Sequence, residues 1–102
     1  TRFGVDYAHQ ADATTQIPEW FRAHLETHLP EVVDKQAIRD ISVQFASAGA
    51  SSLDYEIEVD LDGSAAHLHE KIEFALQRFL VDACNVHNLN IPFSQLTIHR
   101  SD

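Results

Sequence analysis

The sequence predicts an α+β fold in which two helices cover one face of a four-stranded sheet. Three observations carry this prediction. Apolar and polar residues alternate at 2–7 and again at 53–62, as in half-buried strands. An apolar residue recurs every four positions from Ile17, as on a short amphipathic helix, and a longer amphipathic stretch follows Gly63.

The first strand is expected over Arg2–Tyr7, with Phe3, Val5 and Tyr7 on one side. A polar connection from His9 to Gln16 follows. The first helix then opens at Ile17-Pro18, where proline suits the first turn, and Pro30 stops it. Its apolar stripe consists of Ile17, Phe21, Leu25 and Leu29.

A hairpin is expected next. Its first arm spans 41–46, where Ile41, Val43 and Phe45 alternate with polar or small residues, and the turn falls at 48–52. The second arm carries the clearest period of two in the chain. One side presents Leu53, Tyr55, Ile57, Val59 and Leu61, and the other Asp54, Glu56, Glu58, Asp60 and Asp62.

A long helix is expected from about Ala65 to Asn88, and a final strand over 96–99 after the break at 88–92. The buried stripe of that helix is expected to be Leu68, Ile72, Leu76, Phe79, Ala83 and Val86. The order is strand, helix, strand, strand, helix, strand, which is that of a ferredoxin-like βαββαβ plait. Right-handed crossovers place strands one and three at the centre of such a sheet.

Composition limits the functions open to this chain. At 102 residues it forms one domain, 1–102, and no apolar run approaches the roughly 20 residues that cross a bilayer. Seven Lys and Arg against sixteen Asp and Glu give a net charge of −9, which disfavours nucleic acid and anionic membrane surfaces as partners. A lone Cys84 indicates a reducing compartment. Since the sequence lacks Met and opens within a predicted strand, we expect an excised piece of a longer protein.

The five carboxylates of the second hairpin arm are the candidate functional surface. Neighbours at i and i+2 on a strand lie about 7 Å apart and repel by roughly 0.6 kcal/mol in water, or about 2.4 kcal/mol at an effective dielectric of 20. A dry interface without cations is therefore excluded. Two interpretations remain: a solvated sheet face, or an acidic wall beside an ion-accessible space. A dedicated Ca²⁺ or Mg²⁺ site is less favoured because a straight ladder of carboxylates does not converge on one point.

Other chemistry has little support in the sequence. His24 and His28 share a helix face, but packing or an interface contact explains such a pair as well, and no metal is assigned. His67 and His69 diverge on a helix. Cys84 lies among apolar residues, as a structural cysteine does. No glycine-rich phosphate loop occurs, so neither a cofactor nor an enzymatic activity is predicted.

Three segments together resemble the carboxy-terminal domain of small-conductance mechanosensitive channels. They are Phe3-Gly4-Val5-Asp6-Tyr7, Ser51-Ser52-Leu53-Asp54-Tyr55-Glu56-Ile57 and Asn90-Ile91-Pro92-Phe93-Ser94-Gln95-Leu96-Thr97-Ile98-His99. The order matches that family across essentially the whole chain. The turn Ile91, Pro92, Phe93, Ser94, Gln95 resembles the family's closing motif, except that many members carry Pro where this chain has Ser94.

The resemblance implies a homoheptameric channel of the bacterial inner membrane. In that family the carboxy-terminal domains form a hollow cytoplasmic cage, and the pore lies in upstream membrane helices that this chain lacks. The domain would then have a structural and assembly role in ion efflux during osmotic downshock. Two alternatives stay open: a stand-alone ferredoxin-like domain that binds a small regulatory ligand, and, with less support, a small acyl- or phosphate-transfer enzyme.

Overall fold

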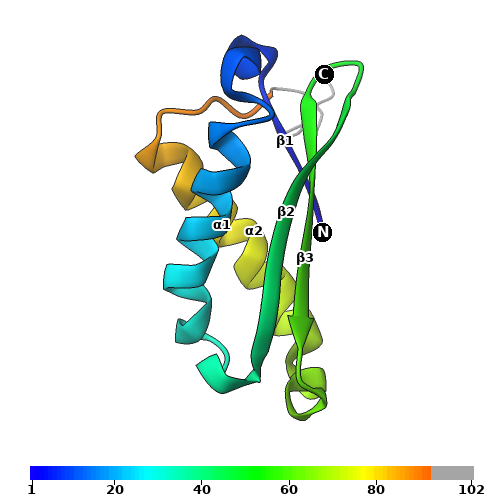
Figure 1. Ribbon diagram of the computed structural model, residues 1–102, viewed down its shortest axis with the longest axis vertical. Helices are drawn as coiled ribbons and strands as arrows, with labels where there is room; N and C mark the ends of the chain where they lie inside the picture. Colours follow the sequence, from blue (N-terminus) through cyan, green and yellow to red (C-terminus); the bar gives the residue numbers. More distant parts are fainter. Residues whose placement is uncertain (93–102) are drawn as a thin grey trace, which may run out of the picture.

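The computed structural model describes residues 1–92, in which two long helices lie on one side of an antiparallel sheet (Figure 1). The strands are β1 (Arg2–Val5), β2 (Ile38–Ala48) and β3 (Leu53–Leu61), and the helices are α1 (Gln16–His28) and α2 (His69–Val86). The described strands are ordered β1-β3-β2, with β3 antiparallel to both neighbours. The acidic strand is therefore internal, which confirms the prediction for β3.

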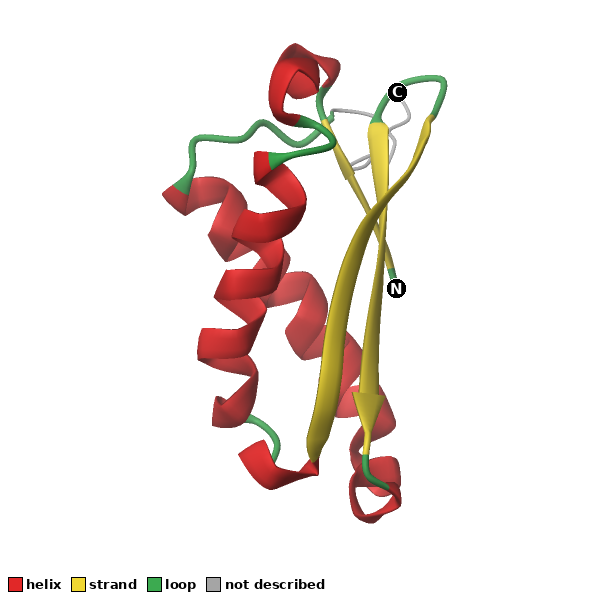
Figure 2. Cartoon of the chain, viewed as in Figure 1, coloured by secondary structure: helices red, strands yellow, loops and turns green. Residues whose placement is uncertain are grey.

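Short 3-10 helices join these elements (Figure 2). They are η1 (Tyr7–Asp12), η2 (Leu29–Glu31), η3 (Lys35–Ala37) and η4 (Gly63–Leu68). An aspartate precedes three of them and accepts a hydrogen bond from a backbone N–H two residues later: Asp6 from Ala8 at 2.8 Å, Asp34 from Gln36 at 3.0 Å and Asp62 from Ser64 at 3.0 Å. Such caps satisfy donors that a helix start leaves unpaired.

These caps correct two predicted boundaries. The first strand ends at Val5 and does not reach Tyr7, because Asp6 turns the chain into η1. The second long helix begins at His69 and not near Ala65, because Asp62 starts η4 first. Aspartate competes for backbone donors in this way wherever a turn is within reach of its short side chain.

β2 is longer than the predicted 41–46. Its pairing with β3 shifts register between Ile38 and Asp40, and again between Phe45 and Ser47. An extra residue at a bulge breaks the period of two. Ile38 is therefore three residues before Ile41, and the alternation of apolar and polar residues is lost there. The strand is continuous in space although its sequence pattern is interrupted.

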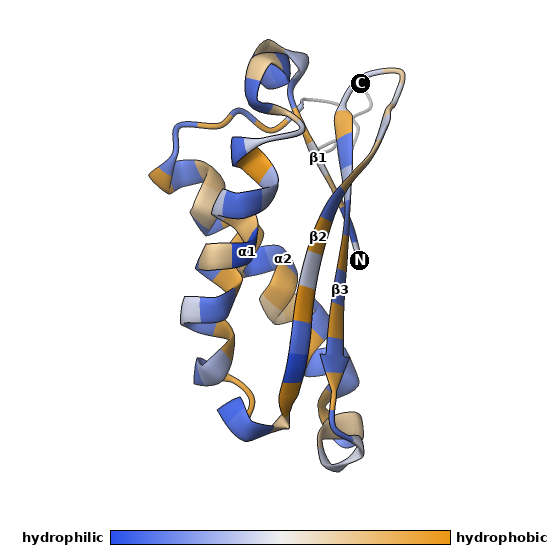
Figure 3. Ribbon diagram, in the orientation of Figure 1, coloured by the Kyte–Doolittle hydropathy of each residue, from blue (hydrophilic) through white to orange (hydrophobic). Residues whose placement is uncertain are grey.

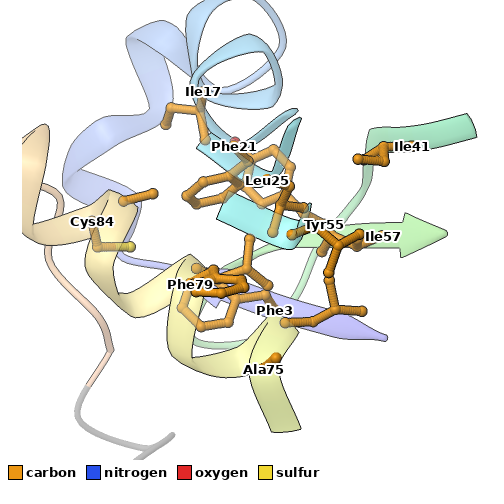
Figure 4. Packing of buried hydrophobic residues seen from close by; sticks show 14 of the residues in the cluster. Phe3, Ile17, Phe21, Leu25, Ile41, Tyr55, Ile57, Ala75, Phe79 and Cys84 are labelled. Carbon is orange, nitrogen blue, oxygen red and sulfur yellow. The ribbon is translucent and has the colours of Figure 1, made fainter. Parts of the chain in front are cut away.

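The core fills the space between the helices and the inner face of the sheet (Figure 4). Phe21 of α1 lies at its centre and meets Phe3 and Tyr55 edge-on, with ring centroids 5.8 and 5.6 Å apart. The Tyr55 hydroxyl donates to the carbonyl oxygen of Ala13 at 2.7 Å. Aromatic pairs of this geometry stabilise a core beyond their buried area. The largest side chains with under 2% exposure are Tyr55, Phe21, Ile17, Leu25, Leu29, Ile57, Leu80, Val5 and Cys84.

The end of α2 departs from the prediction. Val86 was expected in the buried stripe but is 65% exposed. Asn88 adopts the left-handed region at φ 57°, and Leu89 N–H then donates to the Cys84 carbonyl at 2.8 Å. This reversal buries Leu89 at the place where the helix stops. Val86 lies on the last turn, where Leu89 covers the core.

The predicted fourth strand at 96–99 and the motif residues Phe93, Ser94 and Gln95 lie outside the described residues. Four strands are therefore not established, whereas three antiparallel strands and two long helices are. Over residues 1–92, none of the helices combines the length and apolarity needed to span a membrane.

Candidate functional site

The candidate site is the side of the sheet that faces away from the helices. Along β3, buried Leu53, Tyr55 and Ile57 alternate with carboxylates that point to the open side. Figure 3 shows the resulting stripes of hydrophilic and hydrophobic residues on this strand. We call Asp54, Glu56, Glu58 and Asp60, together with Asp40 of β2, the acidic face. Glu56, Glu58, Asp60 and Asp40 are exposed, and Asp54 is half-buried.

Few groups on the neighbouring strands offset this charge. Arg2 of β1 lies opposite Glu56, and Gly4 lies opposite Asp54. On β2, Gln44 lies opposite Glu56, Ser42 opposite Glu58 and Asp40 opposite Asp60. Among these described pairs, Arg2 is the one cation directly opposite a carboxylate. The acidic face is therefore a zone of like charge that needs water or mobile cations beside it.

A hollow of about 160 Å³ lies between β2 and β3 on this face and is lined by Ser42, Gln44, Glu56 and Glu58. Its lining consists of two carboxylates, a hydroxyl and an amide. Within residues 1–92, however, no three side chains of the His, Cys, Asp or Glu type converge closely enough to hold a metal ion. The hollow is suited to a hydrated cation, whose charge the carboxylates attract without displacing its water.

Two of the five predicted carboxylates have local structural roles. Asp62 lies beyond the end of β3, and its side chain caps η4. Asp54 accepts a 2.5 Å hydrogen bond from the Ser52 hydroxyl in the hairpin turn. Glu56, Glu58 and Asp60 form no side-chain hydrogen bond or ion pair within the described chain, so their carboxylates are open to solvent.

The structure also brings together the first two segments on which the family resemblance rests and residues 90–92 of the third. Asp6 N–H donates to the Asn90 carbonyl at 2.9 Å, which joins the first segment to the third. Asn90 N–H in turn contacts Nε2 of His9 at 2.8 Å. The first and second segments pair as strands, from Phe3 opposite Tyr55 to Val5 opposite Leu53. Of the closing turn, Ile91 packs against the core and Pro92 is buried. The first two segments and residues 90–92 of the third therefore meet at the end of the sheet that carries the hairpin turn.

A second cluster combines histidines of α1 with Trp20 and His87, and the sequence predicted only part of it. Trp20, Ala23, His24, Thr27 and His28 of α1 and His87 after α2 line a hollow of about 270 Å³. The His24 and His28 rings lie side by side, with centroids 4.3 Å apart. Burial, followed by repulsion from His28, lowers the pKa of His24. Helical spacing predicted the first two histidines, whereas nothing in the sequence links Trp20 to His87, because only the packing of α1 on α2 joins them.

Cys84 is 1% exposed in the core, and burial raises the pKa of its thiol to about 11. A thiol with that pKa stays protonated near neutral pH and is a poor nucleophile. Cys84 therefore has a packing role.

A scan against models of known protein families finds no match to this chain, and a search of curated proteins finds no similar sequence.

Proposed function

We propose that this chain is a cytoplasmic domain of a small-conductance mechanosensitive channel, on the cytoplasmic side of a bacterial inner membrane. Its role there is to form part of the wall of the cage below the pore, and it carries no catalytic activity. One observation carries the proposal furthest: the first two segments that resemble the family meet residues 90–92 of the third at one end of a sheet whose open side is acidic.

The contacts among these segments support the proposal because the segments are far apart in sequence. Asp6 and Asn90 are joined by a backbone hydrogen bond, and residues 2–5 pair with residues 53–56. A chance likeness of short motifs would not require them to contact one another. Their contact is expected if each motif forms part of one conserved structural junction.

The finer fold belongs to the same proposal. A ferredoxin-like plait has β1 and β3 at its centre and would place its first three strands in the order β1-β3-β2, which is the order of the described sheet. The fourth strand would fall on residues 96–99.

The acidic face supplies the functional element of the proposal. In a homoheptameric cage, seven copies that turned this face inward would surround the lumen with carboxylates. Such a wall concentrates cations within about a Debye length, roughly 8 to 10 Å near physiological ionic strength. The domain would then influence which ions reach the inner mouth of the pore, while gating and conduction belong to the upstream membrane segments.

The experiment uses the complete reading frame that contains this chain. The proposal requires hydrophobic helices encoded upstream of Thr1, a seven-subunit particle in native mass spectrometry and stretch-activated currents in membrane patches.

The double variant Glu56→Gln/Glu58→Gln is expected to reduce the preference of the channel for cations without changing the activating tension. Glu70→Gln, an exposed carboxylate in the first turn of α2, is the matched control. A reading frame without membrane helices would overturn the proposal.

One observation favours the alternative of a small-ligand-binding regulatory domain. A hollow of about 370 Å³ lies between the end of α1 and the bulged start of β2, and its charged lining consists of Lys35 and Arg39 together with Glu26 and Asp40. Pro30, Ile38 and Ile41 supply an apolar floor. A small zwitterionic metabolite would fit this mixed lining, and a screen of such compounds by thermal shift, with Arg39→Gln as the control, would identify it.

A further inference from the structure

The hollow lined by His24, His28, His87 and Trp20 joins α1 to the end of α2 and is separate from the acidic face. Within it, His24 and His28 are one helical turn apart. Their rings are inclined by 40°, with centroids 4.3 Å apart. Imidazole nitrogens bind Zn²⁺ at about 2.0–2.1 Å, so two rings at this separation are close enough to share one ion.

Glu31 fixes which nitrogen of the His28 imidazole carries the proton. Its Oε2 lies 2.9 Å from Nδ1 of His28. A carboxylate accepts hydrogen bonds only, so the neutral imidazole carries its proton on Nδ1 and keeps a lone pair on Nε2. Histidines that bind metals commonly donate their second N–H to a carboxylate in this way, which fixes the ring and increases its basicity.

His24 is half-buried in the same hollow and lies on the same face of α1 as His28. Protonation of either ring would compete with the metal.

We propose that His24 and His28 chelate one transition-metal ion of the Zn²⁺, Ni²⁺ and Cu²⁺ class, with His28 binding through Nε2. Water fills the remaining coordination positions, since among residues 1–92 no third side chain of a ligand type lies close enough. His87 lies flat on Trp20, with centroids 4.3 Å and planes 6° apart, and is not one of the two proposed ligands. The site is open and exchangeable, and its occupancy stabilises the last turns of α1.

The experiment titrates the chain, free of any polyhistidine tag, with CuCl₂, ZnCl₂ and MgCl₂. The chain contains one tryptophan, and Trp20 borders the hollow, so quenching of its emission reports Cu²⁺ binding directly. We expect one strong Cu²⁺ site, weaker Zn²⁺ binding by calorimetry and no response to Mg²⁺. Affinity should fall as the pH is lowered from about 7.5 to about 5.5.

Five variants test the assignment. His24→Gln and His28→Gln should each weaken Cu²⁺ binding by at least about tenfold, and Glu31→Gln by about tenfold. His69→Gln, exposed at the start of α2, and His87→Gln should leave the affinity unchanged. Circular dichroism establishes that each variant is folded. Undiminished binding by His24→Gln, or a loss in His87→Gln as large as in His24→Gln, would overturn the proposal.

Discussion

Asp40 of β2 and Asp60 of β3 lie directly opposite each other, so two carboxylates of the same sign share one cross-strand position on the open side of the sheet. Like charges placed in this way destabilise an antiparallel pair. Asp60→Asn should therefore raise the free energy of unfolding by about 0.2–1 kcal/mol, measured by urea denaturation at low ionic strength.

The matched control for this variant is Glu58→Gln, which removes a carboxylate from the same strand and the same face. Its cross-strand partner is Ser42, which carries no charge. A smaller gain is expected, because only the repulsion along β3 is relieved. Equal gains from both variants would show that the Asp40–Asp60 pair has no special effect.

Sodium chloride should raise the melting temperature of the chain. Glu56, Glu58 and Asp60 are exposed and form no ion pair within the described residues, so their mutual repulsion is open to screening. The measurement is a thermal melt followed by circular dichroism at low and at moderate salt. In a variant with all three residues replaced by Gln, the salt response should shrink. An unchanged melting temperature in the wild-type chain would contradict this account.

Gly49→Ala should destabilise the hairpin. A Cβ at this position would lie 2.7 Å from Oδ2 of Asp54, whose other oxygen accepts the Ser52 hydroxyl. Breaking that contact should cost about 1 kcal/mol. Gly63→Ala is the control, since nothing lies within 4 Å of its added Cβ. Adding Asp54→Ala to Gly49→Ala should remove most of the steric cost, and a double variant that shows no such rescue would exclude the contact as the cause.

Tyr55→Phe should lower the free energy of unfolding by about 1–2 kcal/mol, because the carbonyl of Ala13 loses its buried donor. Burial raises the pKa of Tyr55 to about 12, so its hydroxyl stays a donor across the neutral range. Tyr7→Phe provides the comparison: the Tyr7 hydroxyl donates to Gly49 at the surface, where water can replace it. Urea denaturation of the two variants should separate them. A Tyr55→Phe chain as stable as the wild type would argue against a buried bond at this position.

Acid should destabilise the chain through His24. Burial lowers the pKa of His24 in the folded state, so the unfolded chain takes up the proton first as the pH falls. Its contribution to stability is complete above about pH 6.5, the ordinary pKa of histidine, and is lost as the pH falls below that value. Urea midpoints across this range should depend less on pH in His24→Gln than in the wild type. Identical pH profiles would contradict the assignment.

Elements are predicted well from the sequence where a single hydrophobic periodicity runs through the whole element. Leu53 to Leu61 alternate without interruption, and the strand and its acidic side follow from that pattern, whereas its internal position followed from the predicted order of the elements. Ile17, Phe21 and Leu25 repeat at helical spacing, and all three are buried in α1. In both cases the hydrophobic pattern and the local backbone preference agree.

Prediction fails where a single side chain redirects the backbone. Asp6 and Asp62 cap turns that shorten β1 and delay α2, and periodicity carries no signal for such caps. The bulge beside Arg39 hides the first residues of β2, and Asn88 brings Leu89 into the place expected for Val86. The cluster of Trp20 with His87 is unpredictable for another reason, since it depends on how two helices pack.

Because the helices cover one side of the sheet only, the buried and the exposed residues of β3 are under different evolutionary constraints. Replacing Tyr55 or Ile57 changes the core and is opposed by folding itself. Glu58, which lies opposite the uncharged Ser42, can change freely as far as folding is concerned, and losing its charge would relieve repulsion along β3. Neutral drift would therefore erode the acidity of this face, and related sequences that keep it would show selection for charge beyond any need of the fold.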